Sequence, residues 1–112
     1  MGTASFNGNN ASFDDAIRFA DGDETAIDEI AVAVSMFMMS YEDLHDIDLE
    51  PVVTASYTTR TVFISFTTPG ETAGAAFANG ADAIADLFRM LDARPGAHVA
   101  GWRSCIPEML TA

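Results

Sequence analysis

The sequence contains no lysine, and its five cationic side chains are all arginines. Against them stand 17 aspartates and glutamates, so the formal net charge is −12 at pH 7. Proteins that bind nucleic acid or anionic membranes neutralise phosphates with clustered Lys and Arg. The shortage of cations therefore argues against direct binding to nucleic acid or to an anionic membrane, and the absence of lysine excludes Schiff-base chemistry.

Cysteine and long hydrophobic runs are also scarce. Cys105 is the only cysteine, so no internal disulfide and no set of thiolate metal ligands can form. The longest nearly apolar run, residues 30–39, is about ten residues long, roughly half of what a membrane-spanning helix needs. No basic segment followed by a hydrophobic one marks a signal peptide. We therefore expect a cytoplasmic protein.

Length and composition fit one globular domain. The chain has 112 residues, of which 49% are hydrophobic, and the mean hydropathy is +0.16. This is enough for one hydrophobic core and too little for two. Residues 1–10 are rich in Gly and Asn and show no periodicity, which predicts a flexible N-terminal arm. The domain is therefore assigned to residues 11–112.

The acidic residues are unevenly distributed along the chain. Residues 1–50 contain twelve acids and one arginine, whereas residues 51–112 contain five acids and four arginines. Adaptation to a high-salt host would spread acids over the whole surface, so the asymmetry favours a local acidic face. A salt-adapted domain whose acidity serves only solubility stays as an alternative.

The most apolar stretch predicts a helix from about residue 24 to residue 44 that organises the core. Its apolar stripe runs from Ile27 to Leu44, and Val32 extends it around the axis. The apolar surface is wider than the roughly 100° that packing on one sheet requires. One side therefore either fills the core or meets a partner, most simply a second copy. The candidate dimer or partner contacts are Met36, Met38, Met39 and Tyr41.

A dense acidic segment, residues 42–50, follows this helix. The helix dipole disfavours anions at a C-terminus, so capping does not explain these acids. We predict that they form an acidic face for a basic partner protein. The residues of this face are Glu42, Asp43, Asp46, Asp48 and Glu50, with Asp14 and Asp15 joining them. His45 lies among the acids, but the spacing matches no metal motif, so we expect no metal.

The remaining elements are predicted from periodicity and turn residues. Residues 11–20 fit a helical stripe but also alternate as a strand does, and the strand is preferred because it completes a βαββαβ order. Residues 51–68 predict two strands with a turn near 58–61. Residues 71–93 are predicted to be mostly helical, most securely over 81–93, with the cap near Asn79 or Gly80 and a stop signal at residues 94–96. A last strand covers 97–105.

This order predicts an α+β two-layer sandwich, with a mostly antiparallel sheet and two helices on one face, ferredoxin-like in outline. On the last strand, Trp102 and Arg103 should face opposite sides, with Trp102 covering the core. His98 and Cys105 are candidates for a base and a nucleophile, but no local motif supports that pair. We assign no catalytic residue and no cofactor.

Three functional hypotheses follow. The first is a non-enzymatic interaction or regulatory domain, dimeric, whose acidic face binds a basic partner; one form of it is an inhibitor that mimics DNA. The second is a small dimeric enzyme or ligand-binding protein. Its pocket would lie between helices and sheet and would contain Tyr57, Phe66, His98 and Trp102. The third is the salt-adapted domain, without a binding role for its acids.

Overall fold

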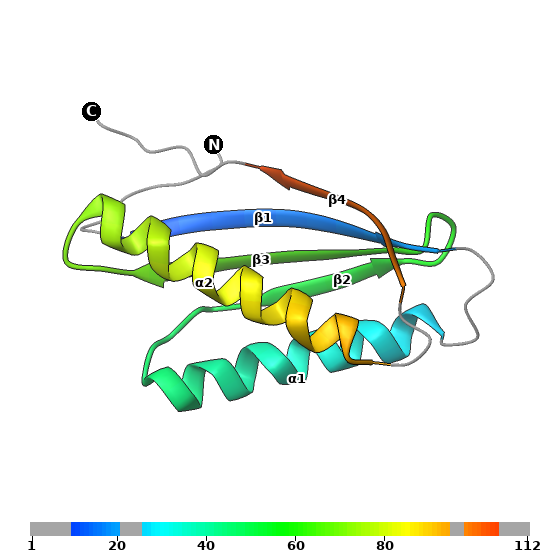
Figure 1. Ribbon diagram of the computed structural model, residues 1–112, viewed down its shortest axis with the longest axis horizontal. Helices are drawn as coiled ribbons and strands as arrows, with labels where there is room; N and C mark the ends of the chain where they lie inside the picture. Colours follow the sequence, from blue (N-terminus) through cyan, green and yellow to red (C-terminus); the bar gives the residue numbers. More distant parts are fainter. Residues whose placement is uncertain (1–9, 21–25, 95–97, 106–112) are drawn as a thin grey trace.

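The computed structural model describes residues 10–20, 26–94 and 98–103 in full, and the backbone alone of residues 104 and 105. Its element order is βαββαβ (Figure 1). The elements are β1 (Asn10–Phe19), α1 (Ile27–His45), β2 (Val52–Ser56), β3 (Thr61–Pro69), α2 (Ala73–Asp92) and β4 (Val99–Cys105). The predicted arm, residues 1–10, lies outside the described part except for its last residue.

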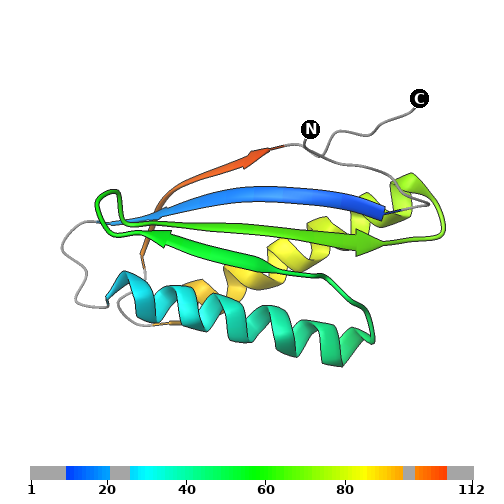
Figure 2. The same cartoon turned by 180° about the vertical axis from the view of Figure 1, so that it is seen from behind.

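The four strands form one sheet in the order β2-β3-β1-β4, and every neighbouring pair is antiparallel. Both helices lie against the same face of this sheet (Figures 1 and 2). The predicted α+β two-layer class, with two helices on one face, is therefore confirmed. The ferredoxin-like outline of the fold stays a prediction. Neither of these two helices lies on the other face of the sheet, which is called the open face below.

Strand β1 lies in the middle of the sheet and shows why its sequence alternates. Phe13, Ile17 and Phe19 are buried on the helix side, whereas Asp14 and Arg18 are exposed on the open face. Because successive side chains of a strand point to opposite faces, the alternating pattern fits a sheet covered on one side. The preference for a strand over a helix at residues 11–20 is confirmed.

Helix α1 packs on the sheet with a stripe of period close to 3.6. The buried members are Ile27, Ile30, Val34, Met38 and Tyr41. The helix starts at Ile27 and ends at His45, close to the predicted 24–44. At its N-terminus the Glu29 carboxylate accepts a hydrogen bond from the Ala26 N–H at 3.4 Å. Residues 21–25, which precede it, lie outside the described residues.

The β2–β3 turn occupies residues 57–60, within one residue of the predicted position. It contains no glycine, and Arg60 takes the left-handed conformation with φ of 48°. The Arg60 Nε donates to the Ala20 carbonyl at 3.0 Å, and the Arg60 carbonyl accepts from the Phe19 N–H at 2.8 Å. These two bonds join the turn to the end of β1, which compensates for the unfavourable backbone angle.

Helix α2 begins well before the predicted cap, so the expectation of a cap at Asn79 or Gly80 is wrong. Thr72 is the N-cap, and its hydroxyl accepts from the Ala75 N–H at 3.1 Å. Gly80 is a buried helical residue, and a Cβ at this position would lie 1.9 Å from Cε1 of Phe13. The glycine therefore allows α2 to approach β1 closely, which its sequence neighbourhood does not reveal.

Candidate functional site

The outer side of α1 exposes a stripe of large apolar side chains. Val32, Met36 and Met39 are 58%, 62% and 60% exposed. Their spacing of four and then three residues places them on one side of the helix, opposite the stripe that packs on the sheet. We call these three residues the outer stripe of α1. Val32 was missing from the predicted contact set, although its spacing from Met36 would have included it.

Two of the predicted contact residues belong to the core instead. Met38 is 1% exposed and Tyr41 is 7% exposed. Burial, and secondly the negative charge of Asp82, raise the pKa of the Tyr41 hydroxyl above its usual value. Consecutive residues on a helix differ by about 100° in direction, so Met38 can be buried against the sheet while Met39 is exposed to solvent. Of the predicted contact set only Met36 and Met39 are exposed, and their contact with a partner stays a prediction.

A shallow groove of about 370 Å³ runs beside the outer stripe, between α1 and the end of α2. It is lined mainly by apolar side chains, together with the charged residues Glu29 and Arg94. The lining residues are Glu29, Val32, Ala33, Met36, Phe37, Ser40, Met90 and Arg94. Val32 and Met36 thus belong both to the outer stripe and to this groove, which a partner side chain can enter.

The acidic segment after α1 has a structural reason that its sequence conceals. The Glu42 carboxylate accepts from the Leu49 N–H at 2.8 Å, and the Glu42 carbonyl accepts from the Ile47 N–H at 3.1 Å. Asp46 is the C-cap of α1 in the left-handed conformation, with φ of 53°. Leu49 is fully buried, and its carbonyl accepts from the Thr67 N–H at 2.8 Å. The Glu42 carboxylate therefore holds the segment in a conformation in which Leu49 bonds to β3, and Glu42 is not part of an exposed acidic face.

We predict that replacing Glu42 by alanine lowers the free energy of unfolding by about 1–3 kcal/mol, because the partly buried Leu49 N–H loses its acceptor. Glu42→Gln keeps an oxygen at the same reach and should cost less than half as much. Urea denaturation followed by circular dichroism measures both. Equal losses for the two variants would show that the negative charge, and not the hydrogen bond, holds the segment.

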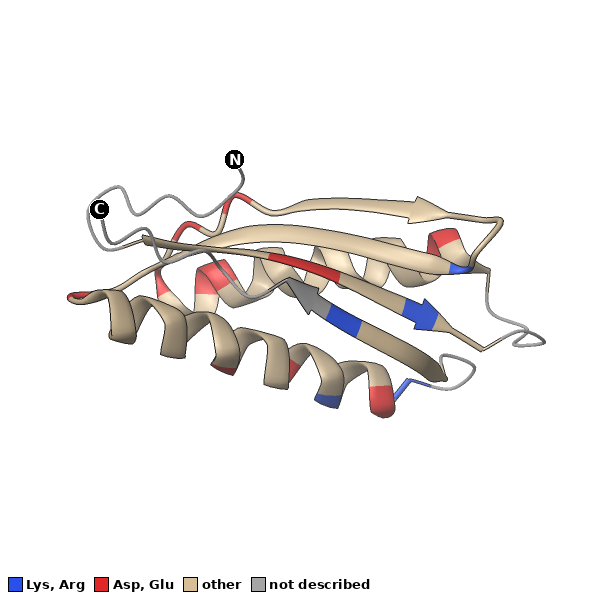
Figure 3. Ribbon diagram, turned by 90° about the horizontal axis from the view of Figure 1, so that it is seen from above, with Lys and Arg blue, Asp and Glu red and all other residues tan. Residues whose placement is uncertain are grey.

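The other carboxylates of this segment point to solvent. Asp43, Asp46, Asp48 and Glu50 are exposed, and none forms an ion pair with an arginine of the described chain. One oxygen of the Asp48 carboxylate is already used within the segment, since its Oδ1 accepts a hydrogen bond from the Glu50 N–H at 3.1 Å. Figure 3 shows acidic segments gathered where α1 ends and the chain continues into β2. The structure thus brings four predicted acids together next to the end of the outer stripe.

Asp14 and Asp15 do not join this acidic group. Asp14 lies on the open face and accepts a hydrogen bond from the Ser65 hydroxyl. Asp15 points to the helix side, is 4% exposed, and has the Trp102 Nε1 3.4 Å from its Oδ2. Adjacent strand residues face opposite layers, so one continuous face cannot contain both carboxylates. Their assignment to the acidic face is therefore wrong for Asp15 and unsupported for Asp14.

The four residues predicted to form a pocket are scattered. Phe66 is buried, with its ring stacked on Phe13 at a centroid distance of 5.0 Å. Tyr57 lies exposed in the β2–β3 turn and His98 is exposed just before β4. Trp102 packs edge-on against Phe88 on the helix side, at a centroid distance of 4.9 Å. They share no pocket among the described residues, because Phe66 is buried in the core, Tyr57 and His98 are exposed near the end of β1, and Trp102 packs on Phe88.

No three His, Cys, Asp or Glu side chains of the described chain are grouped closely enough to hold a metal ion. Among the helices that the structure describes, none is long and apolar enough to cross a membrane. Comparison with protein-family models, with curated proteins and with solved structures found no match. The function must therefore be argued from the geometry of this chain.

Proposed function

We propose that this protein is a non-enzymatic interaction domain that binds a basic partner protein through the outer side of α1. The contact would combine the outer stripe with the exposed acids Asp43, Asp46, Asp48 and Glu50. One observation carries the proposal: the large apolar side chains of the outer stripe are 58–62% exposed on the side of α1 that faces away from the sheet. Apolar side chains repeated along one exposed helix side are typical of a docking surface.

The energetics explain why the stripe and the acids would be needed together. Full burial of an exposed Val or Met side chain contributes about 1.5–3 kcal/mol. Association costs an estimated 4–15 kcal/mol or more in lost translational and rotational freedom. Three apolar side chains therefore leave little net affinity. Neighbouring carboxylates would raise the association rate and select partners that carry cations.

Charge favours a basic partner over a second copy at this surface. Asp28 and Glu29 are exposed at the N-terminal end of α1, and Asp43 is exposed near its C-terminal end. A second copy docked on the outer stripe would bring these like charges together in either orientation. Such a homodimer should strengthen as salt screens the repulsion, whereas a complex with a basic partner should weaken. The two occupants therefore predict opposite salt dependences.

A more specific form of the proposal is an inhibitor that mimics DNA. In that form the carboxylates after α1 take the place of phosphates on a nucleic-acid-binding protein. The separation between these acids and the outer stripe would then decide which partner surfaces fit. A protein whose acidity serves only solubility would use neither surface, and it would gain stability toward molar salt without binding anything.

The test uses a synthetic amphipathic helical peptide of leucine and lysine as the probe, measured by fluorescence anisotropy at 50 mM and 500 mM salt. The double variant Met36→Gln, Met39→Gln keeps the charge and should weaken binding about tenfold. The triple variant Asp46→Asn, Asp48→Asn, Glu50→Gln should remove most of the salt dependence.

The matched control is Val52→Thr, because Val52 is 60% exposed but lies on the open face of the sheet. It should leave peptide binding unchanged. Sedimentation of the wild-type protein at both salt concentrations tests for the homodimer. If the double methionine variant binds the peptide as tightly as the wild type does, the binding is non-specific charge attraction. This result would refute the proposed docking side.

A further inference from the structure

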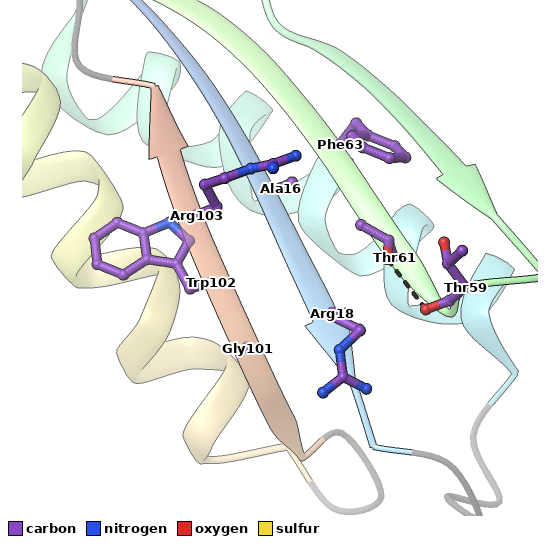
Figure 4. Close-up of a pocket in the computed structure, with 8 residues that line it drawn as sticks. All are labelled: Ala16, Arg18, Thr59, Thr61, Phe63, Gly101, Trp102 and Arg103. Carbon is purple, nitrogen blue, oxygen red and sulfur yellow. Dashed lines mark hydrogen bonds between the residues drawn. The ribbon is translucent and has the colours of Figure 1, made fainter.

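A second surface of opposite charge lies on the open face of the sheet. Strand register places Arg18 of β1 opposite Gly101 of β4, and Ala16 opposite Arg103. Arg18 and Arg103 are therefore diagonal neighbours on one face, where such positions lie about 7–8 Å apart at the backbone. Figure 4 shows both side chains on the near side of the sheet, with the helices behind it.

These two arginines form no polar side-chain contact within the part of the chain that the structure describes. Arg18 and Arg103 are exposed, and neither forms an ion pair or a side-chain hydrogen bond with another described residue. By contrast, Arg60 bonds the Ala20 carbonyl at 3.0 Å, and Arg89 pairs with Asp86. Within the described residues of this chain of net charge −12, Arg18 and Arg103 thus lie on the same face without an ion-pair partner.

The space between the two arginines is an open depression of about 400 Å³. Gly101 lines the depression, and a Cβ there would already be in van der Waals contact with Arg18, 3.8 Å from its Nε, so a larger side chain would enter this space. Phe63 is 42% exposed at the β3 side of the depression. The complete lining is Ala16, Arg18, Thr59, Thr61, Phe63, Gly101, Trp102 and Arg103. Its volume is at the lower end of the range for small-ligand sites.

We propose that this depression binds a small phosphate monoester that carries a planar ring. The guanidinium group offers a planar fork of donors that matches phosphate oxygens, and a monoester carries close to two negative charges at pH 7. The exposed edge of Phe63 offers an apolar surface against which a ring can stack. A nucleoside monophosphate has both parts at the right size.

The charge around the depression limits how large the anion can be. Asp14 lies on the same face, in the neighbouring hollow that Arg103 also lines, and it is already hydrogen-bonded to Ser65. A polyanion such as a nucleic acid would extend beyond the two arginines and meet the acids elsewhere on the surface. At physiological salt, charges more than about 8 Å away are largely screened, so a compact dianion experiences mainly the two arginines and Asp14, which strand register also places diagonal to Arg103.

The experiment is a ¹⁵N–¹H NMR titration of the full chain with adenosine monophosphate, inorganic phosphate and adenosine, each used alone. Adenosine monophosphate should shift the amide signals of Ala16, Gly101 and Arg103 in a saturable way. Phosphate should bind more weakly at the same amides, and adenosine should give no saturable shift. Absence of saturable shifts with both phosphate compounds would refute the site.

Two variants separate charge from space. Arg103→Gln should weaken binding about tenfold or more, because it removes one charged fork. Gly101→Val keeps both arginines but fills the depression, and it should abolish binding while the other amide signals stay in place. The matched control is Arg89→Gln on α2, which should bind as the wild type does.

A peptide with the sequence of residues 42–50 is the last arm of the titration. If this peptide shifts the same amides and adenosine monophosphate does not, the depression holds the acidic segment of a second copy and the phosphate proposal is wrong. The outcome is independent of the peptide-binding test on α1, because the open face and the outer stripe lie on opposite layers of the molecule.

Discussion

Replacing Met38 by alanine should lower the free energy of unfolding by about 2–5 kcal/mol, whereas the same change at Met39 should alter it by less than about 0.5 kcal/mol. Met38 is 1% exposed beneath α1 and Met39 is 60% exposed on its outer side. Truncating the buried methionine loses its transfer free energy and leaves a cavity. Truncating the exposed one removes side-chain surface that is mostly in water.

Urea denaturation curves of the two variants measure this difference. A domain of this size is stabilised by about 5–15 kcal/mol, so Met38→Ala should shift the midpoint strongly while the slope stays constant. Met39→Ala is the control for any general effect of removing methionine from α1. Similar losses at both positions would mean that α1 is rotated about its axis, which would also remove the basis for the outer stripe.

The second large effect is expected at Gly80. Changing Gly80 to alanine should destabilise the protein by about 1–3 kcal/mol, although alanine favours a helix over glycine by about 1 kcal/mol. The added Cβ would lie 1.9 Å from Cε1 of Phe13, far inside van der Waals contact. The ring cannot move aside easily, since it stacks on Phe66 at 5.0 Å and on Phe77 at 5.8 Å.

Gly74 provides the matched control in the same helix. The nearest atom to a Cβ at Gly74 is Oγ1 of Thr72, 3.9 Å away, so Gly74→Ala should be neutral or stabilise by up to about 1 kcal/mol. Thermal unfolding measures both variants. Adding Phe13→Leu to Gly80→Ala should cost less than the two single changes together, because the smaller side chain relieves the clash. Strict additivity would contradict the proposed contact.

The two proposed surfaces give the charge asymmetry of the chain a functional interpretation. Exposed acids cluster after the C-terminal end of α1, whereas Arg18 and Arg103 lie on the open face of the sheet. If both sites bind as proposed, the protein links a basic partner on one layer to a small phosphate compound on the other. A change in partner affinity on adding adenosine monophosphate would then report a coupling between the layers.

Several features could be predicted from the sequence because they depend on local periodicity. The alternation of Phe13, Ile17 and Phe19 predicts a strand, and the apolar period of residues 27–41 predicts a helix. The strand-rich segment after residue 51 predicts the hairpin, and the stop at residues 94–96 predicts the end of α2. These patterns were enough for the two-layer α+β class.

Local sequence patterns did not predict the role of residues whose position depends on contacts with residues distant in the sequence. Gly80 looked like a helix cap, but it is an interior residue made necessary by Phe13. Asp15 looked like a surface acid, and only strand pairing shows that it faces the buried layer. Glu42 looked like part of an acidic face, and its hydrogen bond to Leu49 closes a loop whose shape the sequence does not reveal.

The amino-acid sequence by itself determined the order of the elements, the division of charge and the presence of an α1 that is apolar on more than one side. Each of these depends on residues a few positions apart, whose relation is set by helix and strand geometry. Only the tertiary structure decided which side of α1 is buried and which acids stay free. It also decided that Arg18 and Arg103 share one face. Those outcomes depend on strand register and helix packing, which bring together residues more than eighty positions apart.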